Sequence, residues 1–194
     1  MTLTQAIDWE GRYREGRTGW ERQGPHPCFL AWRENGALAP PGRVLVPGAG
    51  RSEEPLRLAE AGFSVTVVDA APSAVAVQQE RLKGTGGEAF VADLFTWDPP
   101  TPFDLIYEQT CLCALPPGLW PDYAARLARW LRPGGRLFAL FMQTETEGGP
   151  PFHCDLAAMH ALFGAELWSW PERLPDPVAH PAIGREQPAI LLRR

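Results

Sequence analysis

The chain has 194 residues, the size of one ordinary domain, and 45% of them are hydrophobic, which is enough to fill a core. Its formal net charge is −5 and no run of Lys and Arg appears, which argues against nucleic acid or an anionic membrane surface as a partner. No segment approaches the roughly 20 apolar residues that span a bilayer, and the N-terminus lacks a signal-peptide pattern. We therefore expect one cytoplasmic domain, residues 1–194.

Residues 1–41 are rich in Trp, Arg, Gly and Pro and do not follow the pattern of the rest of the chain. Within them, Pro27 to Asn35 has a short helical pattern that predicts buried positions at Phe29, Leu30 and Trp32.

From residue 43 onward, short apolar runs alternate with amphipathic segments. The predicted strands are 43–46, 63–68, 88–91, 103–107, 136–141, 167–170 and 189–192, and the predicted helices are 53–61, 72–82, 119–131 and 155–163. Pro133-Gly134-Gly135 predicts a sharp turn between the third of these helices and the fifth strand. Such alternation predicts an α/β fold with a mostly parallel sheet and helices on both faces.

The turn after the first strand carries Gly48 and Gly50, which allow a tight bend and a close approach to a ligand. Ligands of open parallel sheets bind beyond the carboxyl ends of the strands. Position 53 is Glu where a dinucleotide-binding loop has its third Gly, and a carboxylate there would repel a pyrophosphate. The loop thus favours a neutral or cationic ligand over a nicotinamide cofactor, although a purely structural turn is the alternative.

Three acidic positions follow the next three strands. Asp69 lies about twenty residues beyond the Gly loop, where a carboxylate can accept the ribose hydroxyls of a nucleoside, or else cap the helix that begins at Pro72. Asp93 could accept from an adenine amino group while Leu94 packs on the ring; the alternative is a solvated loop carboxylate. Glu108, followed by Gln109, faces the reacting group in this fold class or caps the next turn.

Several segments in order resemble the thiopurine S-methyltransferase superfamily, and the halide/thiol methyltransferase branch is the most similar in pattern. They are the aromatic lead-in at 9–20, the Gly loop at 42–54, Asp93-Leu94-Phe95-Thr96-Trp97, the fourth-strand motif at 103–108, and the runs 114–117, 131–137 and 148–152. The resemblance covers roughly residues 9–155 and implies a Rossmann-like, seven-stranded sheet whose last strand is antiparallel.

The resemblance also implies roles for individual residues. Residues 1–41 would act as a cap whose Trp9, Tyr13 and Trp20 close over S-adenosylmethionine. Gly48, with Gly50, would approach its methionine part, and Glu108 would lie on the cofactor side of the fourth-strand edge. Asp69 would hold the ribose, and Asp93 with Leu94 the adenine. Thiopurine enzymes commonly carry Arg after the acidic residue of the fourth-strand motif; Gln109 stands here, which disfavours an anionic, thiopurine-like acceptor.

The acceptor pocket is expected near Gln109, Cys111, Phe152 and His153. A buried, inert thiol is the alternative for Cys111, and the Cys and His spacing does not match structural zinc, so no metal is expected. We expect a monomer that transfers methyl in line to a small thiol, halide or metalloid anion and releases S-adenosylhomocysteine. A non-catalytic cofactor-binding module and a nicotinamide-dependent oxidoreductase are the rival hypotheses.

Overall fold

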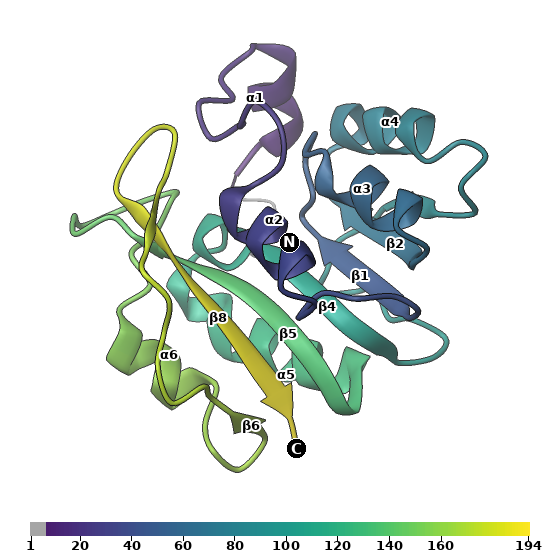
Figure 1. The fold of residues 1–194 in the computed structure, drawn as a ribbon. Helices are drawn as coiled ribbons and strands as arrows, with labels where there is room; N and C mark the ends of the chain where they lie inside the picture. Colours follow the sequence, from purple (N-terminus) through teal and green to yellow (C-terminus); the bar gives the residue numbers. More distant parts are fainter. Residues whose placement is uncertain (1–6) are drawn as a thin grey trace.

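A computed structural model describes residues 7–194, so residues 1–6 of the expected cap lie outside the described part (Figure 1). The described strands are β1 (Arg43–Pro47), β2 (Ser64–Asp69), β3 (Glu88–Val91), β4 (Phe103–Gln109), β5 (Leu131–Gln143), β6 (Trp168–Ser169), β7 (Val178–Ala179) and β8 (Arg185–Arg193). The helices are α1 (Trp9–Arg14), α2 (Pro27–Glu34), α3 (Glu54–Glu60), α4 (Pro72–Arg81), α5 (Trp120–Trp130) and α6 (Leu156–Leu162).

All the described strands belong to one sheet. Its order is β3-β2-β1-β4-β5-β8-β6, with β1 to β5 parallel and β8 antiparallel to both of its neighbours. The expected α/β architecture and the antiparallel last strand are confirmed. The path has the seven strands expected, and the two-residue β7 adds a short strand that pairs with β8 outside that path.

Alternating side chains of the sheet build two separate cores. On one face Val44, Val46 and Phe138 pack with α2, α3 and α4; on the other, Leu45 and Leu137 pack with α5 and α6. In Figure 1, α2 lies in front of the sheet and α5 behind it. Burial of both faces explains why the strands have continuous apolar runs instead of alternating ones.

Two expectations about the N-terminal part of the chain need correction, one at α2 and one at α1. Leu30 is 52% exposed, whereas Cys28, Phe29 and Trp32 are buried. The helical period places residues 28 and 32 on one face and turns position 30 toward solvent. The six-residue helix α1 was not expected at all; its first turn is capped by Asp8, whose carboxylate accepts from the Gly11 N–H at 2.7 Å.

The segment at 131–135 also differs from the expectation. Helix α5 ends at Trp130, and Leu131 already pairs with Phe103 of β4. Pro133-Gly134-Gly135 is an irregularity inside β5, because the register with β4 resumes only at Arg136. No helix among residues 7–194 is long and apolar enough to cross a membrane.

Candidate active site

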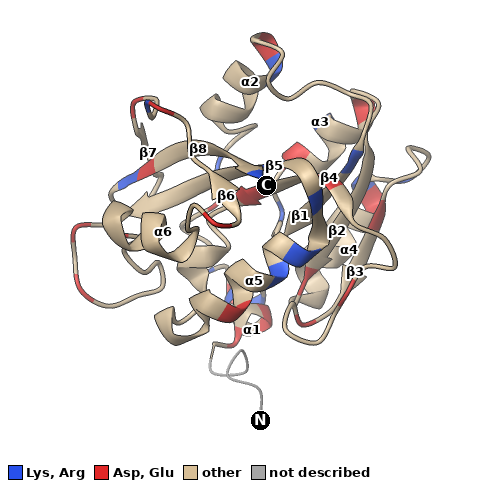
Figure 2. Cartoon of the chain, turned by 90° about the horizontal axis from the view of Figure 1, so that it is seen from below, with Lys and Arg blue, Asp and Glu red and all other residues tan. Residues whose placement is uncertain are grey.

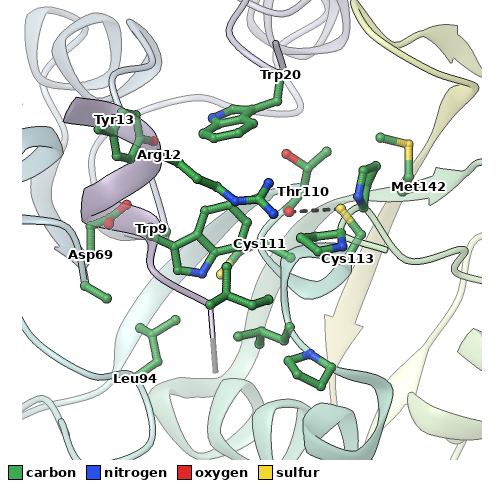
Figure 3. A pocket seen from close by; sticks show the side chains of 18 of the residues that line it. Trp9, Arg12, Tyr13, Trp20, Asp69, Leu94, Thr110, Cys111, Cys113 and Met142 are labelled. Carbon is green, nitrogen blue, oxygen red and sulfur yellow. Dashed lines mark hydrogen bonds between the residues drawn. The ribbon is translucent and has the colours of Figure 1, made fainter. Parts of the chain in front are cut away.

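A cavity of about 150 Å³ opens at the carboxyl ends of the parallel strands, beneath α1 (Figure 3). Strand ends and the loops after them contribute most of the cavity wall. Residues of α1 and of the segment that follows α1 cover the cavity. The residues expected from the sequence that line it are Trp9, Tyr13, Trp20, Gly48, Asp69, Asp93, Leu94 and Cys111. Residues scattered over the whole chain are thus brought to one place by the sheet order.

The two glycines of the first loop are required by close contacts on both sides. Gly48 has φ +56°, and a Cβ there would lie 2.6 Å from the Cys111 Sγ. Gly50 has φ +54°, and a Cβ there would overlap the Tyr13 hydroxyl. Gly48 lines the cavity, whereas Gly50 lies beside it in a smaller neighbouring cavity. The loop therefore allows both the turn after β4 and helix α1 to approach β1 closely.

Asp69 is held rigidly at the end of β2. Its two carboxylate oxygens accept from the Gly50 N–H at 2.8 Å and from the Ala71 N–H at 2.9 Å, and the residue is 7% exposed. Burial raises the pKa of this carboxyl above its ordinary value, although the backbone N–H groups oppose the effect. Asp69 is not the N-cap of α4, because that position is Ala71 and has no side-chain cap hydrogen bond. Asp69 holds the turn before α4 through the Ala71 N–H and lines the cavity, and its ribose role stays a prediction.

Asp93 and Leu94 line the same cavity from the loop after β3. The Asp93 carboxylate accepts from the Phe95 N–H at 2.9 Å, which fixes the turn, and Leu94 is buried. An apolar side chain next to an oriented carboxylate suits a heteroaromatic base with an exocyclic amino group.

Three aromatic rings form the roof of the cavity. The rings of Trp9 and Tyr13 each meet the Trp20 ring edge to face, with centroids 5.6 and 5.7 Å apart. Helix α1 is tied to α4 through Glu10, whose carboxylate accepts from the Ser73 N–H at 2.9 Å and from its hydroxyl. The roof thus rests on the helix that follows Asp69.

The segment that follows Trp20 in the chain is anchored in the protein interior. His26 is fully buried. Its backbone N–H donates to the Glu54 carboxylate at 2.7 Å, and its ring Nε2 lies 2.9 Å from the Glu186 carboxylate of β8. Arg22 donates to the same Glu186 carboxylate. These contacts fix the chain that follows Trp20 in the protein interior.

Glu108 and Gln109 are not among the residues that line the main cavity in the described part of the chain. Glu108 is 2% exposed, and its Oε1 accepts from the Leu112 N–H at 2.7 Å, so it caps the turn after β4. Burial raises its pKa to about 7. Gln109 accepts from the Tyr107 hydroxyl at 2.8 Å and lines the smaller cavity.

The cysteines are buried neutral thiols. Burial raises the pKa of Cys111 and of Cys113, and the Cys113 Sγ donates to the Thr110 carbonyl at 3.0 Å (Figure 3). No group of His, Cys, Asp and Glu in residues 7–194 is arranged to hold a metal ion.

Phe152 and His153 do not line the cavity, although Pro150 and Pro151 just before them do. Phe152 packs against the core around α5, and the His153 Nδ1 accepts from the Thr144 N–H at 3.1 Å.

Arg12, Thr110, Met142 and His180 are among the lining residues that sequence reasoning missed. For Arg12 a signal existed, because it follows Trp9 by three residues and would share its face in a helix. His180 comes from the segment between β7 and β8, for which the sequence offered no pattern.

Figure 2 shows Lys and Arg lying among Asp and Glu on several elements instead of gathering on one face. The charged surface therefore gives no support to a nucleic-acid interface.

Comparisons with known proteins agree on one family. The family model of thiopurine S-methyltransferase matches residues 4–173. The chain is 34% identical to a probable thiol methyltransferase 2 of Arabidopsis thaliana over 162 residues, which are 81% of this chain and 71% of the relative. It is 30% identical to thiocyanate methyltransferase 1 of the same plant (79% and 70% covered) and 29% identical to a Legionella pneumophila thiopurine S-methyltransferase (74% of each).

Solved structures share the fold at lower identity. A magnesium protoporphyrin IX methyltransferase from Synechocystis, solved with S-adenosylhomocysteine, aligns with TM-score 0.76 at 16% identity over 99% of both chains. A Burkholderia thailandensis 1,6-didemethyltoxoflavin N1-methyltransferase aligns with TM-score 0.73 at 21% identity, covering 96% of this chain and 85% of the other.

Proposed function

The chain belongs to the thiopurine S-methyltransferase family and is an S-adenosylmethionine-dependent methyltransferase, and we propose that it methylates small sulfur or halide anions. Thiolates and hydrosulfide are the preferred acceptors in this proposal, ahead of thiopurines. The observation that carries it is an acceptor side of the cavity whose wall is largely apolar and offers no free general base.

The cofactor fits the residues on the other side of the cavity. Asp69 would accept the ribose hydroxyls, Asp93 and Leu94 would hold the adenine, and the bare backbone at Gly48 leaves room for the methionine chain. Trp9, Tyr13 and Trp20 would cover the ligand, and ring faces suit a sulfonium cation. When bound, S-adenosylmethionine supplies a methyl group on a positively charged sulfur that a nucleophile displaces in line.

Four of the lining residues that titrate are poor general bases. Cys111 and Cys113 are thiols with raised pKa values, and Asp69 already accepts two backbone hydrogen bonds. The His180 Nδ1 accepts from the Ala182 N–H at 3.2 Å, and burial lowers the pKa of this imidazole, so its proton sits on Nε2 and its accepting nitrogen is occupied. An acceptor must therefore arrive without a proton to lose, as halides and ionised thiols do.

Leu115, Met142 and Pro151 give this side of the cavity an apolar wall. Such a wall excludes water and makes the meeting of an anion with a sulfonium favourable, because the two charges cancel as the methyl group moves. The residues of the chain then contribute by positioning the two partners at reaction distance. We further propose that residues 1–194 act as one catalytic unit and as a monomer, with 9–20 as the cover, because one chain supplies every lining residue described.

The test is a competition assay with equal concentrations of hydrosulfide, a small alkyl thiol, iodide, thiocyanate, a thiopurine, an amine and a catechol. Volatile products are measured in the headspace and the others by mass spectrometry. We expect kcat/KM to be highest for hydrosulfide and the small thiol and lowest for the amine and catechol. If an amine, a catechol or a macromolecule is the best acceptor, the sulfur and halide assignment is wrong.

A further inference from the structure

Arg12 brings a permanent positive charge to the cavity. It lies on α1, one turn after Trp9, and its guanidinium carbon sits 5.2 Å from the centroid of the Trp9 ring. In Figure 3 its side chain extends from the side of Trp9 across the cavity toward Thr110 and Cys113. Guanidinium groups stay protonated throughout the pH range of enzymes, so this charge cannot be removed by titration.

No carboxylate among residues 7–194 forms an ion pair with this guanidinium. Asp8 caps α1 through the Gly11 N–H, and Glu10 on the same helix is bound to Ser73. In the cavity itself, both Asp69 oxygens receive backbone N–H groups. The Arg12 ring contact with Trp9 leaves its N–H donors available to a ligand.

Two cations would meet in this cavity if the cofactor alone were present. The sulfonium carries one positive charge and Arg12 the other, in surroundings where charges are weakly screened. An anion placed between them relieves the repulsion and interacts with both. The carboxylates that line the cavity, Asp69 and Asp93, lie on the cofactor side in the proposed function, so a small anion on the Thr110 side would interact with both Arg12 and the sulfonium.

We propose that Arg12 is the specificity-determining residue that binds the acceptor in its anionic form, an inference that rests on the proposed function. In the transfer, a lone pair of the anion forms the bond to the methyl carbon, and the bond from that carbon to the sulfonium breaks with its electron pair kept by sulfur. No proton moves, and both products are neutral. The methylated product then has no charge for Arg12 to hold, which favours its release.

The cofactor carboxylate is the competing partner for Arg12, but other cations lie nearer to its expected place. Arg22 and Arg51 line the smaller cavity beside the Gly48–Gly50 loop, where the methionine end is expected. The Arg51 guanidinium packs over the Tyr13 ring at 4.7 Å. This leaves Arg12 for the acceptor side.

The experiment compares Arg12→Met, Arg12→Lys and Arg14→Met. Arg14 is exposed on the same helix and does not line the cavity, so its variant controls for the loss of one charge from α1. Thiocyanate binding to protein saturated with S-adenosylhomocysteine is measured by calorimetry, together with the Kd of S-adenosylhomocysteine itself. Both readouts are independent of turnover.

We expect Arg12→Met to weaken thiocyanate binding about tenfold or more, the size of one charge-assisted hydrogen bond, and to change the Kd of S-adenosylhomocysteine less than twofold. Arg12→Lys should retain most of the thiocyanate affinity, and Arg14→Met should match the wild type. Unchanged thiocyanate binding in Arg12→Met, or no binding to the wild type, overturns the proposal. So does a loss confined to S-adenosylhomocysteine, because that result would assign Arg12 to the cofactor.

The outcomes also separate this inference from the proposed function. If Arg12→Met loses thiocyanate binding but the wild type methylates none of the sulfur or halide acceptors, the anion site stands and the proposed function fails. If the wild type methylates them and Arg12→Met does so with unchanged KM, the function stands and the role of Arg12 is wrong.

Discussion

Replacing Glu108 by Gln should make the protein more stable at alkaline pH than the wild type. The carboxyl is 2% exposed, its Oε1 accepts from the Leu112 N–H, and its Oε2 is buried with no hydrogen-bond partner among the described residues. Gln keeps the shape and the oxygen that accepts from Leu112, and it removes the charge. The carboxyl does not line the cavity, so cofactor affinity should change less than twofold.

The size of the effect follows from the pKa of Glu108, which burial raises from 4.5 to about 7. Because the folded protein holds this proton more tightly than the unfolded chain, the protonated carboxyl contributes stability below pH 4.5. That stability is lost as the pH rises through about 7. At about 1.4 kcal/mol for each tenfold change in proton affinity, the wild type should lose about 3 kcal/mol between pH 4.5 and 8. The Gln variant has no proton to lose and should escape this loss.

Urea unfolding of both proteins between pH 5 and 8.5 measures the difference directly, because the other titrating groups cancel in it. Asp104→Asn is the matched control. Its carboxylate accepts from the Arg43 N–H and the Arg132 Nε, which hold its pKa below 3.8. The Asp104 carboxylate is therefore ionised throughout this pH range, and its contribution to the free energy of unfolding does not change with pH. Asp104→Asn should be less stable than the wild type by an amount that does not change with pH. Parallel curves for wild type and Glu108→Gln would refute the reasoning.

Three further predictions concern the cavity. Asp69→Ala, with folding verified by circular dichroism, should weaken S-adenosylmethionine binding by about 1.5–3 kcal/mol in calorimetry; unchanged affinity would remove the ribose role. Gly48→Ala should lower the free energy of unfolding by on the order of 2–4 kcal/mol, because a methyl group there meets the Cys111 Sγ and the backbone is left-handed. A loss below 0.5 kcal/mol would contradict that. Protease cleavage after the exposed Arg14 and Arg17 should slow when S-adenosylhomocysteine is added, because the rings of α1 line the same cavity. Equal rates would speak against a ligand-ordered cover.

The sheet could be predicted from the sequence because each of its main strands is a buried apolar run bounded by turn residues. The segments that escaped prediction are the ones whose stability comes from tertiary contacts. Helix α1 has six residues, too few to be stable alone, and it depends on Glu10 bound to Ser73. Strand β7 has two residues and is defined by its pairing with β8.

The residues of the candidate site also differ in how far the sequence could place them. Strand-end positions such as Asp69 and Leu94 could be placed, since parallel strands end at one edge and the fold puts ligands there. Glu108 also ends a strand, but its side chain turns back to cap the chain that follows, a choice of direction that spacing does not reveal. Phe152 was expected near the acceptor pocket, yet it packs against the core, and Pro150 and Pro151 before it line the cavity.

The position of β8 has a consequence for synthesis on the ribosome. Residues 185–193 are made after β5 and β6, but they lie between these two strands and pair with β5 along eight residue pairs. Until they emerge, β5 presents an open edge whose side chains from Leu137 to Met142 become fully buried in the finished fold. An unpaired apolar edge of this kind recruits other strands. The nascent chain is therefore exposed to aggregation or chaperone capture in the interval between the synthesis of β5 and that of β8, and substitutions in β8 should reduce yield more than they reduce activity per folded molecule.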